Sequence, residues 1–234
     1  MRAFICARRP LRALALVAFI ALAGCGGRAG HTPSSATPGG PVGTPTATSA
    51  PRVLYSADWS KGLADWQATA GWKVEQGALQ SDTGDNRQVT IPFEPVTSNY
   101  AVEYTMQVVE PKEGGSCVVA AAPSPASDGY QARLDGMLAL GNSQFALHPQ
   151  FGVTIDPMGH EDLSTSPTVD FELGTHVTTY RIEVRGPLVI VLVNGRRLSP
   201  PAQSTTTATL STGPLTISCS LASARFSSLT ISSI

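Results

Sequence analysis

From Val53 onward, the chain alternates short runs of apolar and polar side chains, with glycine separating them roughly every eight to twelve residues. Segment 99–109 is a clear example, because tyrosine, valine and methionine occupy its even positions and mostly polar residues occupy its odd positions. Side chains of a β-strand point to opposite faces in turn, so such a segment would be half-buried against a core. Helical periodicity is absent from this part of the chain. The pattern therefore predicts an all-β sandwich or barrel.

The same reasoning assigns the remaining strands. The run 188–193 is apolar on both faces, which predicts a central strand, and Asn194-Gly195 after it is the residue pair that best tolerates a type I′ hairpin turn. Segment 156–167 fits no period and is expected to be an inserted surface loop. Further strands are expected at 53–59, 72–75, 77–79, 116–122, 129–136, 178–185, 209–210, 215–220 and 225–231, with another hairpin across 137–147.

The N-terminus has the features of an export signal. Four arginines precede an apolar run from Ala13 to Leu22, which is far shorter than the roughly 20 residues that cross a bilayer. The motif Leu22-Ala23-Gly24-Cys25 resembles the bacterial lipobox, an aliphatic residue and two small residues before a cysteine. We therefore expect residues 1–24 to be a lipoprotein signal peptide and the Cys25 thiol to carry the lipid. The alternative is a soluble secreted protein cleaved after Ala23, since 21–23 also fits an A-x-A site.

Composition divides the rest of the chain into two parts. Residues 25–51 are almost entirely glycine, proline, serine, threonine and alanine, a composition that cannot bury a core and predicts a disordered tether on the lipid anchor. Residues 52–234 have a length that fits a single folded domain. With the signal removed, 12 Lys and Arg face 17 Asp and Glu, a net charge of −5, which argues against nucleic acid or anionic lipid as partners. We expect a monomer at the outer face of the cytoplasmic membrane or cell envelope, held there by the lipid on Cys25.

The cysteines fall into distinct roles. Cys6 leaves with the signal and Cys25 is the lipid site, so Cys117 and Cys219 remain as a pair. Oxidising conditions outside the cytoplasm favour a disulfide between them, which would close a loop of about 100 residues and stabilise the fold by about 4 kcal/mol. Two buried free thiols are the alternative.

Several motifs, in this order along the chain, resemble those of concanavalin A-like lectin/glucanase domains. They are Asp58-Trp59, Gly62-Leu63, Trp66, Gly71-Trp72-Lys73-Val74, Gly77-Ala78-Leu79, Gly129-Tyr130 through Leu134, Tyr180 through Val184, Val191 through Arg196, and Ala224 through Ile231. The resemblance implies a two-sheet antiparallel jelly-roll sandwich. Such domains often bind or cleave carbohydrate, so it also implies a possible glycan ligand.

The hydrolytic relatives of the laminarinase type carry Glu-x-Asp-x-x-Glu on one strand, because alternate residues share a face and their carboxylates can act together. This chain lacks that motif, and its nearest approaches, 170–172 and 110–113, have the wrong order or contain proline. The sequence thus favours a non-catalytic module that recognises carbohydrate. A 3-keto-disaccharide hydrolase, whose opening and closing patterns are similar, is the enzyme alternative, and a structural or protein-interaction envelope lipoprotein is another.

Two kinds of residue are candidates for contacting a glycan. Trp59 and Trp66 lie near glycine in the first loop, where exposed indoles could stack on a sugar ring. Polar rows on two strands could line a concave sheet face, although the outer face of an antiparallel sheet is polar in most proteins. The row residues are Glu103, Gln107, Gln131, Arg133 and Asp135.

Other chemistry finds little support. The consecutive residues 160–162, with His148 nearby, lack the spacing of metal ligands and are expected to form a solvated loop. No serine lies in a G-x-S-x-G turn. We therefore expect no metal and no cofactor.

Overall fold

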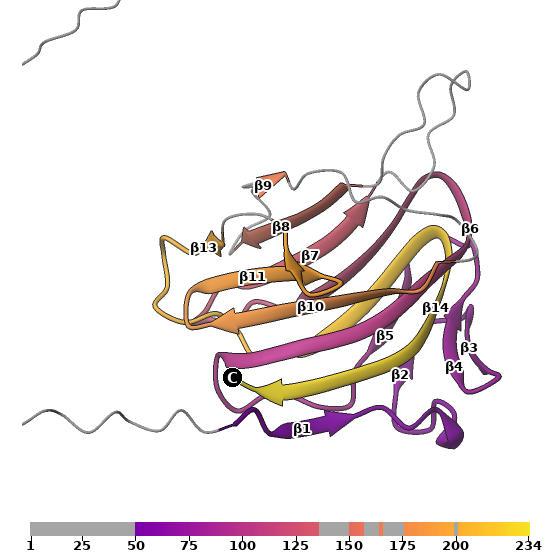
Figure 1. Ribbon diagram of the computed structural model, residues 1–234, viewed down its shortest axis with the longest axis horizontal. Helices are drawn as coiled ribbons and strands as arrows, with labels where there is room; N and C mark the ends of the chain where they lie inside the picture. Colours follow the sequence, from indigo (N-terminus) through magenta and orange to yellow (C-terminus); the bar gives the residue numbers. More distant parts are fainter. Residues whose placement is uncertain (1–49, 136–149, 157–163, 166–175, 199–200) are drawn as a thin grey trace, which may run out of the picture. The chain divides into compact units, whose positions relative to one another are not determined.

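The structure is a computed structural model, and it describes residues 50–135, 150–156, 164–165, 176–198 and 201–234 (Figure 1). Within the chain, Thr48–Ile234 forms one compact unit. Several sequence predictions fall outside the described residues: the signal peptide 1–24, Cys25, most of the tether, the hairpin at 137–147, His148, residues 160–162 and the acidic segment 170–172.

Apart from one 3₁₀ turn, the regular structure of the described residues consists of β-strands, which confirms the all-β prediction. None of these residues belongs to a helix of the length and apolarity needed to cross a bilayer. The elements are β1 (Val53–Ser56), η1 (Trp59–Lys61), β2 (Gln67–Ala68), β3 (Trp72–Glu75), β4 (Ala78–Ser81), β5 (Arg87–Thr90), β6 (Asn99–Ala121), β7 (Gly129–Asp135), β8 (Gln150–Asp156), β9 (Ser164–Thr165), β10 (Thr178–Arg185), β11 (Leu188–Val193), β12 (Arg196–Arg197), β13 (Ala202–Gln203) and β14 (Leu215–Ser233).

Two long antiparallel strands, β6 and β14, organise the fold and appear as long curved ribbons in Figure 1. The first half of β6 and the second half of β14 lie side by side between β1 and β10. On its other side β10 pairs with β11, and β11 pairs with the short strands β12 and β13. The other halves of the two strands lie between β5 and β7, with β2 beyond β5 and β8 and β9 beyond β7. We call these the first sheet and the second sheet. β4 pairs with the middle of β14, and β3 pairs with β4.

The continuity of β6 differs from the sequence prediction of two strands at 99–109 and 116–122. Pro111 and Gly114, which has φ of 73°, interrupt the alternation in the middle of the strand. β14 nevertheless stays paired with it on both sides of the interruption, through register shifts near Leu221 and Ser223. Such bulges bend a strand and increase its twist. One strand therefore passes from the first sheet into the second.

The two sheets pack face to face around a common core. The hydroxyl oxygens of Tyr100 on β6 and Tyr130 on β7 are 3.1 Å apart in the interior. The rings of Phe151 on β8 and Tyr180 on β10 stack with centroids 5.5 Å apart. Each pair joins the first sheet to the second, so the outer faces of the sheets point away from each other. The fold is thus the two-sheet antiparallel jelly-roll sandwich that the resemblance implied.

A disulfide joins Cys117 to Cys219, as the cysteine pattern predicted. The two residues are directly opposite each other in the register of β6 and β14, with Cα atoms 4.2 Å apart. The alternative of two free thiols does not apply in this structure. The bond lies in the half of each strand that belongs to the second sheet, where it crosslinks positions 102 residues apart in sequence.

Three local predictions can be compared with the structure. The Asn194-Gly195 turn is confirmed, since both residues have positive φ (48° and 75°) and Val193 pairs with Arg196. The prediction that Leu188–Val193 is a central strand is wrong, because among the described residues the outer side of β11 pairs only with the two-residue strands β12 and β13. Its outward side chains are half-buried rather than fully buried, so an apolar strand here does not require a central place.

The region after β7 also differs. β8 was not anticipated from the sequence, although its residues Phe151 and Val153 are buried in the core. The segment 156–167 was expected to be entirely loop, but Ser164–Thr165 forms the short strand β9 on β8. Residues 209–210, expected as a strand, form none. Two-residue pairings such as β9 are too short for a periodicity argument to detect.

Candidate functional site

Two adjoining cavities lie where β1, at one edge of the first sheet, approaches β2 and β5, at one edge of the second. The first, which we call the Tyr55 cavity, has a volume of about 230 Å³, and the second, the Phe93 cavity, has a volume of about 490 Å³. They meet at Asp65 and Pro92, which line both. Other lining residues are Tyr55, Asp58, Lys61 and Trp66 in the Tyr55 cavity, and Gln67, Thr90, Phe93, Glu94 and Pro214 in the Phe93 cavity.

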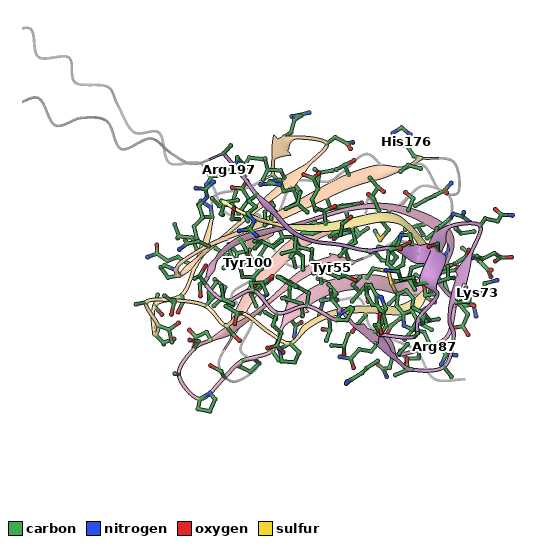
Figure 2. The ribbon with its side chains drawn as sticks, turned by 90° about the horizontal axis from the view of Figure 1, so that it is seen from below. Tyr55, Lys73, Arg87, Tyr100, His176 and Arg197 are labelled. Atoms are coloured by element: carbon green, nitrogen blue, oxygen red, sulfur yellow. A yellow bond between two sulfur atoms is a disulfide. The ribbon has the colours of Figure 1, made fainter. Side chains whose placement is uncertain are left out.

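Four aromatic rings form a cluster beside these cavities, three of them line the cavities, and Tyr55 in the middle of the cluster is labelled in Figure 2. Tyr55 stacks on Phe93 with centroids 5.6 Å apart and an interplanar angle of 19°, and it meets Trp66 edge to face at 6.5 Å. Trp66 in turn lies 5.2 Å from Trp59. Tyr55, Trp66 and Phe93 are half-buried and line the cavities, whereas Trp59 is buried. We call these four residues the edge cluster.

Hydrogen bonds between residues of the loop itself hold the loop that carries the two tryptophans. The Asp58 carboxylate caps η1 by accepting hydrogen bonds from the backbone N–H of Ser60 at 3.1 Å and from its hydroxyl at 2.6 Å. Gly62, at φ of 68°, ends the turn and donates its N–H to the Trp59 carbonyl. The Trp66 N–H donates to the Leu63 carbonyl at 3.0 Å. This order of residues therefore sets the spacing that brings Trp66 back onto Trp59.

Phe93 joins the edge cluster from the segment that follows β5. The Ile91 N–H donates to the Leu215 carbonyl at 2.9 Å, and the Phe93 N–H donates to the Ile91 carbonyl at 2.8 Å. Pro92 and Pro95 have no N–H and cannot continue a strand ladder, so the chain leaves the sheet here. Phe93 is thus presented from a loop rather than from a strand facing the core.

The cavities contain more negative than positive charge. Lys61 lies 3.5 Å from Asp58, and hydrogen bonds from Ser60, together with this ammonium, lower the pKa of the Asp58 carboxyl. Burial and the nearby charge of Asp65 raise the pKa of the Tyr55 hydroxyl, which therefore remains a neutral donor and acceptor at physiological pH. Within the described chain, no ion pair involves Asp65.

These features suit a ligand with both an apolar face and polar edges. The half-buried rings can pack against an apolar ring face, and carboxylates can accept hydrogen bonds only from donors such as hydroxyl or amino groups. Pockets with an aromatic wall and a few converging polar groups are the usual form of small-ligand sites.

The two tryptophans that the sequence offered as candidate sugar contacts differ in burial. Trp66 lines the Tyr55 cavity, as a contact residue would. The expectation that Trp59 is exposed is wrong, because the residue is only 6% exposed and belongs to the core. Trp59 supports Trp66 from beneath and presents no open face of its own.

Glu103 and Gln107 lie on β6, on the outer face of the first sheet. The Glu103 carboxylate is 3.3 Å from Arg181, which is also 2.9 Å from Glu183, and Glu183 pairs with Arg185 at 2.9 Å. Burial would raise the pKa of Glu183, but hydrogen bonds and charge from the two arginines outweigh this and lower it. Glu103 is therefore part of an ion-pair network that ties β6 to β10.

Gln131 and Arg133 lie on β7, on the outer face of the second sheet, where Arg133 donates to the Gln131 side chain at 3.1 Å. Asp135 is the last residue of β7, and its side chain is outside what the structure describes. Because the outer faces of the two sheets point in opposite directions, the β7 row and the β6 row cannot line one surface. The expectation of a single concave face formed by both rows is wrong, since β6 changes sheets between its two halves.

Sequence reasoning missed Tyr55, Asp65, Phe93 and Glu94 as site residues. One signal for Phe93 was present, because an aromatic residue in the run Pro92-Phe93-Glu94-Pro95 cannot be an ordinary core position of a central strand. The other three had no distinguishing pattern, since their proximity depends on how β1, β2 and β5 meet. Among the described residues, no group of three or more histidine, cysteine, aspartate or glutamate side chains could hold a metal ion.

Comparisons with known proteins find similarity in structure only. No family model matches the chain, and no curated protein matches it in sequence. A carbohydrate-binding module, CBM66 from Bacillus subtilis, is similar with a TM-score of 0.54 and 15% identity, over 73% of this chain and 97% of that one. A Bacillus subtilis protein of unknown function with a galectin-like fold has a TM-score of 0.58 and 12% identity, over 77% and 96% of the two chains.

A third similar structure is SCLam, a non-specific endo-β-1,3(4)-glucanase from family GH16. Its TM-score is 0.56 at 9% identity, over 79% of this chain and 92% of that one. At such low identity the likeness concerns the fold alone. Together with the paired long strands and the face-to-face sheets, it identifies the fold of this chain as the concanavalin A-like jelly roll.

Proposed function

We propose that this protein is an exported, lipid-anchored, non-catalytic module that recognises carbohydrate at the cell envelope. The observation that carries the proposal is the edge cluster, which presents Tyr55, Trp66 and Phe93 half-buried on two adjoining cavities beside carboxylates. Aromatic faces pack against the C–H faces of sugar rings, and carboxylates accept hydrogen bonds from sugar hydroxyls.

The similar structures support this choice of ligand. They include a carbohydrate-binding module. They also include a glucanase, but the present sequence lacks the Glu-x-Asp-x-x-Glu motif of laminarinase-type hydrolases. Recognition without cleavage is therefore the better-supported activity.

The anchor rests on the sequence. The lipobox-like motif ending at Cys25 would place the lipid at the start of the mature chain, and the tether 25–51 would separate the folded domain from the membrane by about 30 Å as a flexible coil. Metabolic labelling with a palmitate analogue tests this. We expect label and membrane association in the natural chain and neither in Cys25→Ala, and an unlabelled natural chain would contradict the anchor.

Binding is tested with the purified protein against a panel of soluble polysaccharides, with release of reducing sugar followed in parallel. We expect saturable binding without product, and weaker binding by Trp66→Ala. The matched control is Trp72→Ala, which removes an indole outside both cavities and should reduce stability while leaving affinity unchanged. Product release would favour the hydrolase alternative, and no binding across the panel would favour a structural lipoprotein.

A further inference from the structure

Two acidic side chains line the Phe93 cavity. Asp65 and Glu94 both line it, and neither forms an ion pair with any described residue. Lys61 lines the neighbouring Tyr55 cavity and lies 3.5 Å from Asp58. Two carboxylates therefore face the Phe93 cavity without a positive partner.

Asp65 and Glu94 differ from the other unpaired acidic side chains of the described chain in lining one cavity together. Asp58, Glu75, Asp82, Glu103 and Glu183 lie within 4 Å of a lysine or arginine nitrogen, whereas Asp85, Glu110 and Glu113, like Asp65 and Glu94, form no ion pair with a described residue. Asp65 and Glu94 are exposed and line a cavity of about 490 Å³, so a ligand can reach them. A cation entering the cavity would gain two ionic contacts, whereas an anion would be repelled by both.

The aromatic ring of Phe93 also favours a positively charged ligand. Phe93 lines the cavity, and its ring stacks on Tyr55 at 5.6 Å. The face of an aromatic ring carries partial negative charge and attracts ammonium groups. A carboxylate has no proton to donate when ionised, so the cavity favours ligand groups that donate hydrogen bonds and carry positive charge.

Building on the carbohydrate recognition proposed above, we infer that the Phe93 cavity selects glycans containing unsubstituted amino sugars and rejects glycans of uronic acids. The ammonium group lies between Asp65 and Glu94, and the adjacent sugar ring packs on Trp66 and Tyr55 in the Tyr55 cavity. The shared residue Asp65 places the two subsites side by side.

The test compares three oligosaccharides of equal length with the purified full chain by isothermal titration calorimetry. The ligands are a glucosamine oligomer, its N-acetylated form and a galacturonic acid oligomer, at a pH where the amines are protonated. We expect the glucosamine oligomer to bind about tenfold more tightly than the N-acetylated one, as two screened ionic contacts imply, and the uronic acid oligomer to bind most weakly.

The decisive variant is Asp65→Asn with Glu94→Gln, which keeps the shape of the cavity and removes both charges. It should lose the tenfold preference while still binding the N-acetylated oligomer. The matched control is Glu110→Gln with Glu113→Gln, which removes two exposed carboxylates outside the cavities and should keep the preference. Raising salt from about 0.01 M to about 1 M, which shortens the screening length from about 30 Å to about 3 Å, should reduce the preference in the natural chain.

The outcomes separate this inference from the function on which it rests. Equal binding of the amino and N-acetylated oligomers overturns the charge selection but leaves carbohydrate recognition in place. A preference that survives in the Asp65/Glu94 variant also overturns it, because another part of the surface would then bind the amine. Failure of all three oligomers and of the polysaccharide panel overturns both.

Discussion

Two groups of aromatic residues in this molecule are similar in composition but differ in their surroundings. The interior row runs from one sheet to the other through stacked or tilted rings with centroids 5.3–6.0 Å apart. Its members are Phe151, Tyr180, Tyr104, Phe226 and Trp72, all buried. The edge cluster has a similar ring spacing, from 5.2 to 6.5 Å, but three of its four rings are only half-buried and line cavities.

The difference comes from where the supporting strands lie. The interior row is carried mainly by β6, β8, β10 and β14, which have a neighbouring strand on each side. The edge cluster is carried by β1 and by loops at the sheet edges, where no further strand of the described chain covers the rings. Burial raises tyrosine pKa values in both groups, so the hydroxyls are neutral in each. Access to solvent, rather than residue type, therefore separates the packing role of the interior row from the binding role proposed for the edge cluster.

The largest expected effect tests the interior row. Phe226→Ala would leave a cavity between Trp72 and Tyr104 and should lower the free energy of unfolding by about 3–5 kcal/mol. The matched change in the edge cluster, Phe93→Ala, should cost only about 1 kcal/mol, because that ring is already half-exposed. Urea denaturation of both variants measures the contrast. Equal losses would mean that the edge cluster is also a packing core.

The second prediction tests the edge cluster by affinity. Trp66→Ala should weaken binding of the best glycan about tenfold, roughly 1.4 kcal/mol, because it removes the ring that lines the Tyr55 cavity. Circular dichroism should show the same β-signal as in the natural chain. Calorimetry that finds unchanged affinity would remove the edge cluster from the binding site.

A substitution outside both aromatic groups serves as a control that should change stability but not glycan affinity. Gly195 has φ of 75° in the hairpin turn, and a Cβ added there would meet no atom within 4 Å. Gly195→Ala should therefore cost about 1 kcal/mol from conformational strain alone, without a change in glycan affinity. Thermal unfolding measures the cost, and a change in affinity would show that the hairpin takes part in binding.

The smallest expected effect on stability comes from removing one carboxylate of the ion-pair network on the first sheet. Glu183→Gln should lower stability by less than about 1 kcal/mol at neutral pH, because Arg181 keeps Glu103 as a partner. The folded-state pKa of Glu183 is lowered from its ordinary value of 4.5, so its contribution is present above that pH and is lost as the pH falls through the folded-state value. The stability difference between variant and natural chain should therefore shrink below pH 4.5. A constant difference across acidic pH would contradict the ion-pair explanation.

Much of the fold could be predicted from local pattern. Strands β10 and β11 occur at the predicted residues, and the Asn194-Gly195 turn has the predicted positive φ values, because alternation and turn chemistry are local properties. The disulfide was also predicted, since only two cysteines remained for the folded domain. Of the candidate site, only Trp66 was predicted, and its half-buried position on a cavity follows from the glycine-containing loop.

Tertiary packing decided what the local pattern could not. The sequence by itself determined an all-β domain and the turn after β11, because these depend on neighbours along the chain. Only the tertiary structure joined two predicted strands into β6, put the rows of Glu103 and Arg133 on opposite faces, and buried Trp59 while leaving Trp66 on a cavity. Each of these outcomes depends on which strands become neighbours across the sandwich, and residues far apart in sequence fix that arrangement.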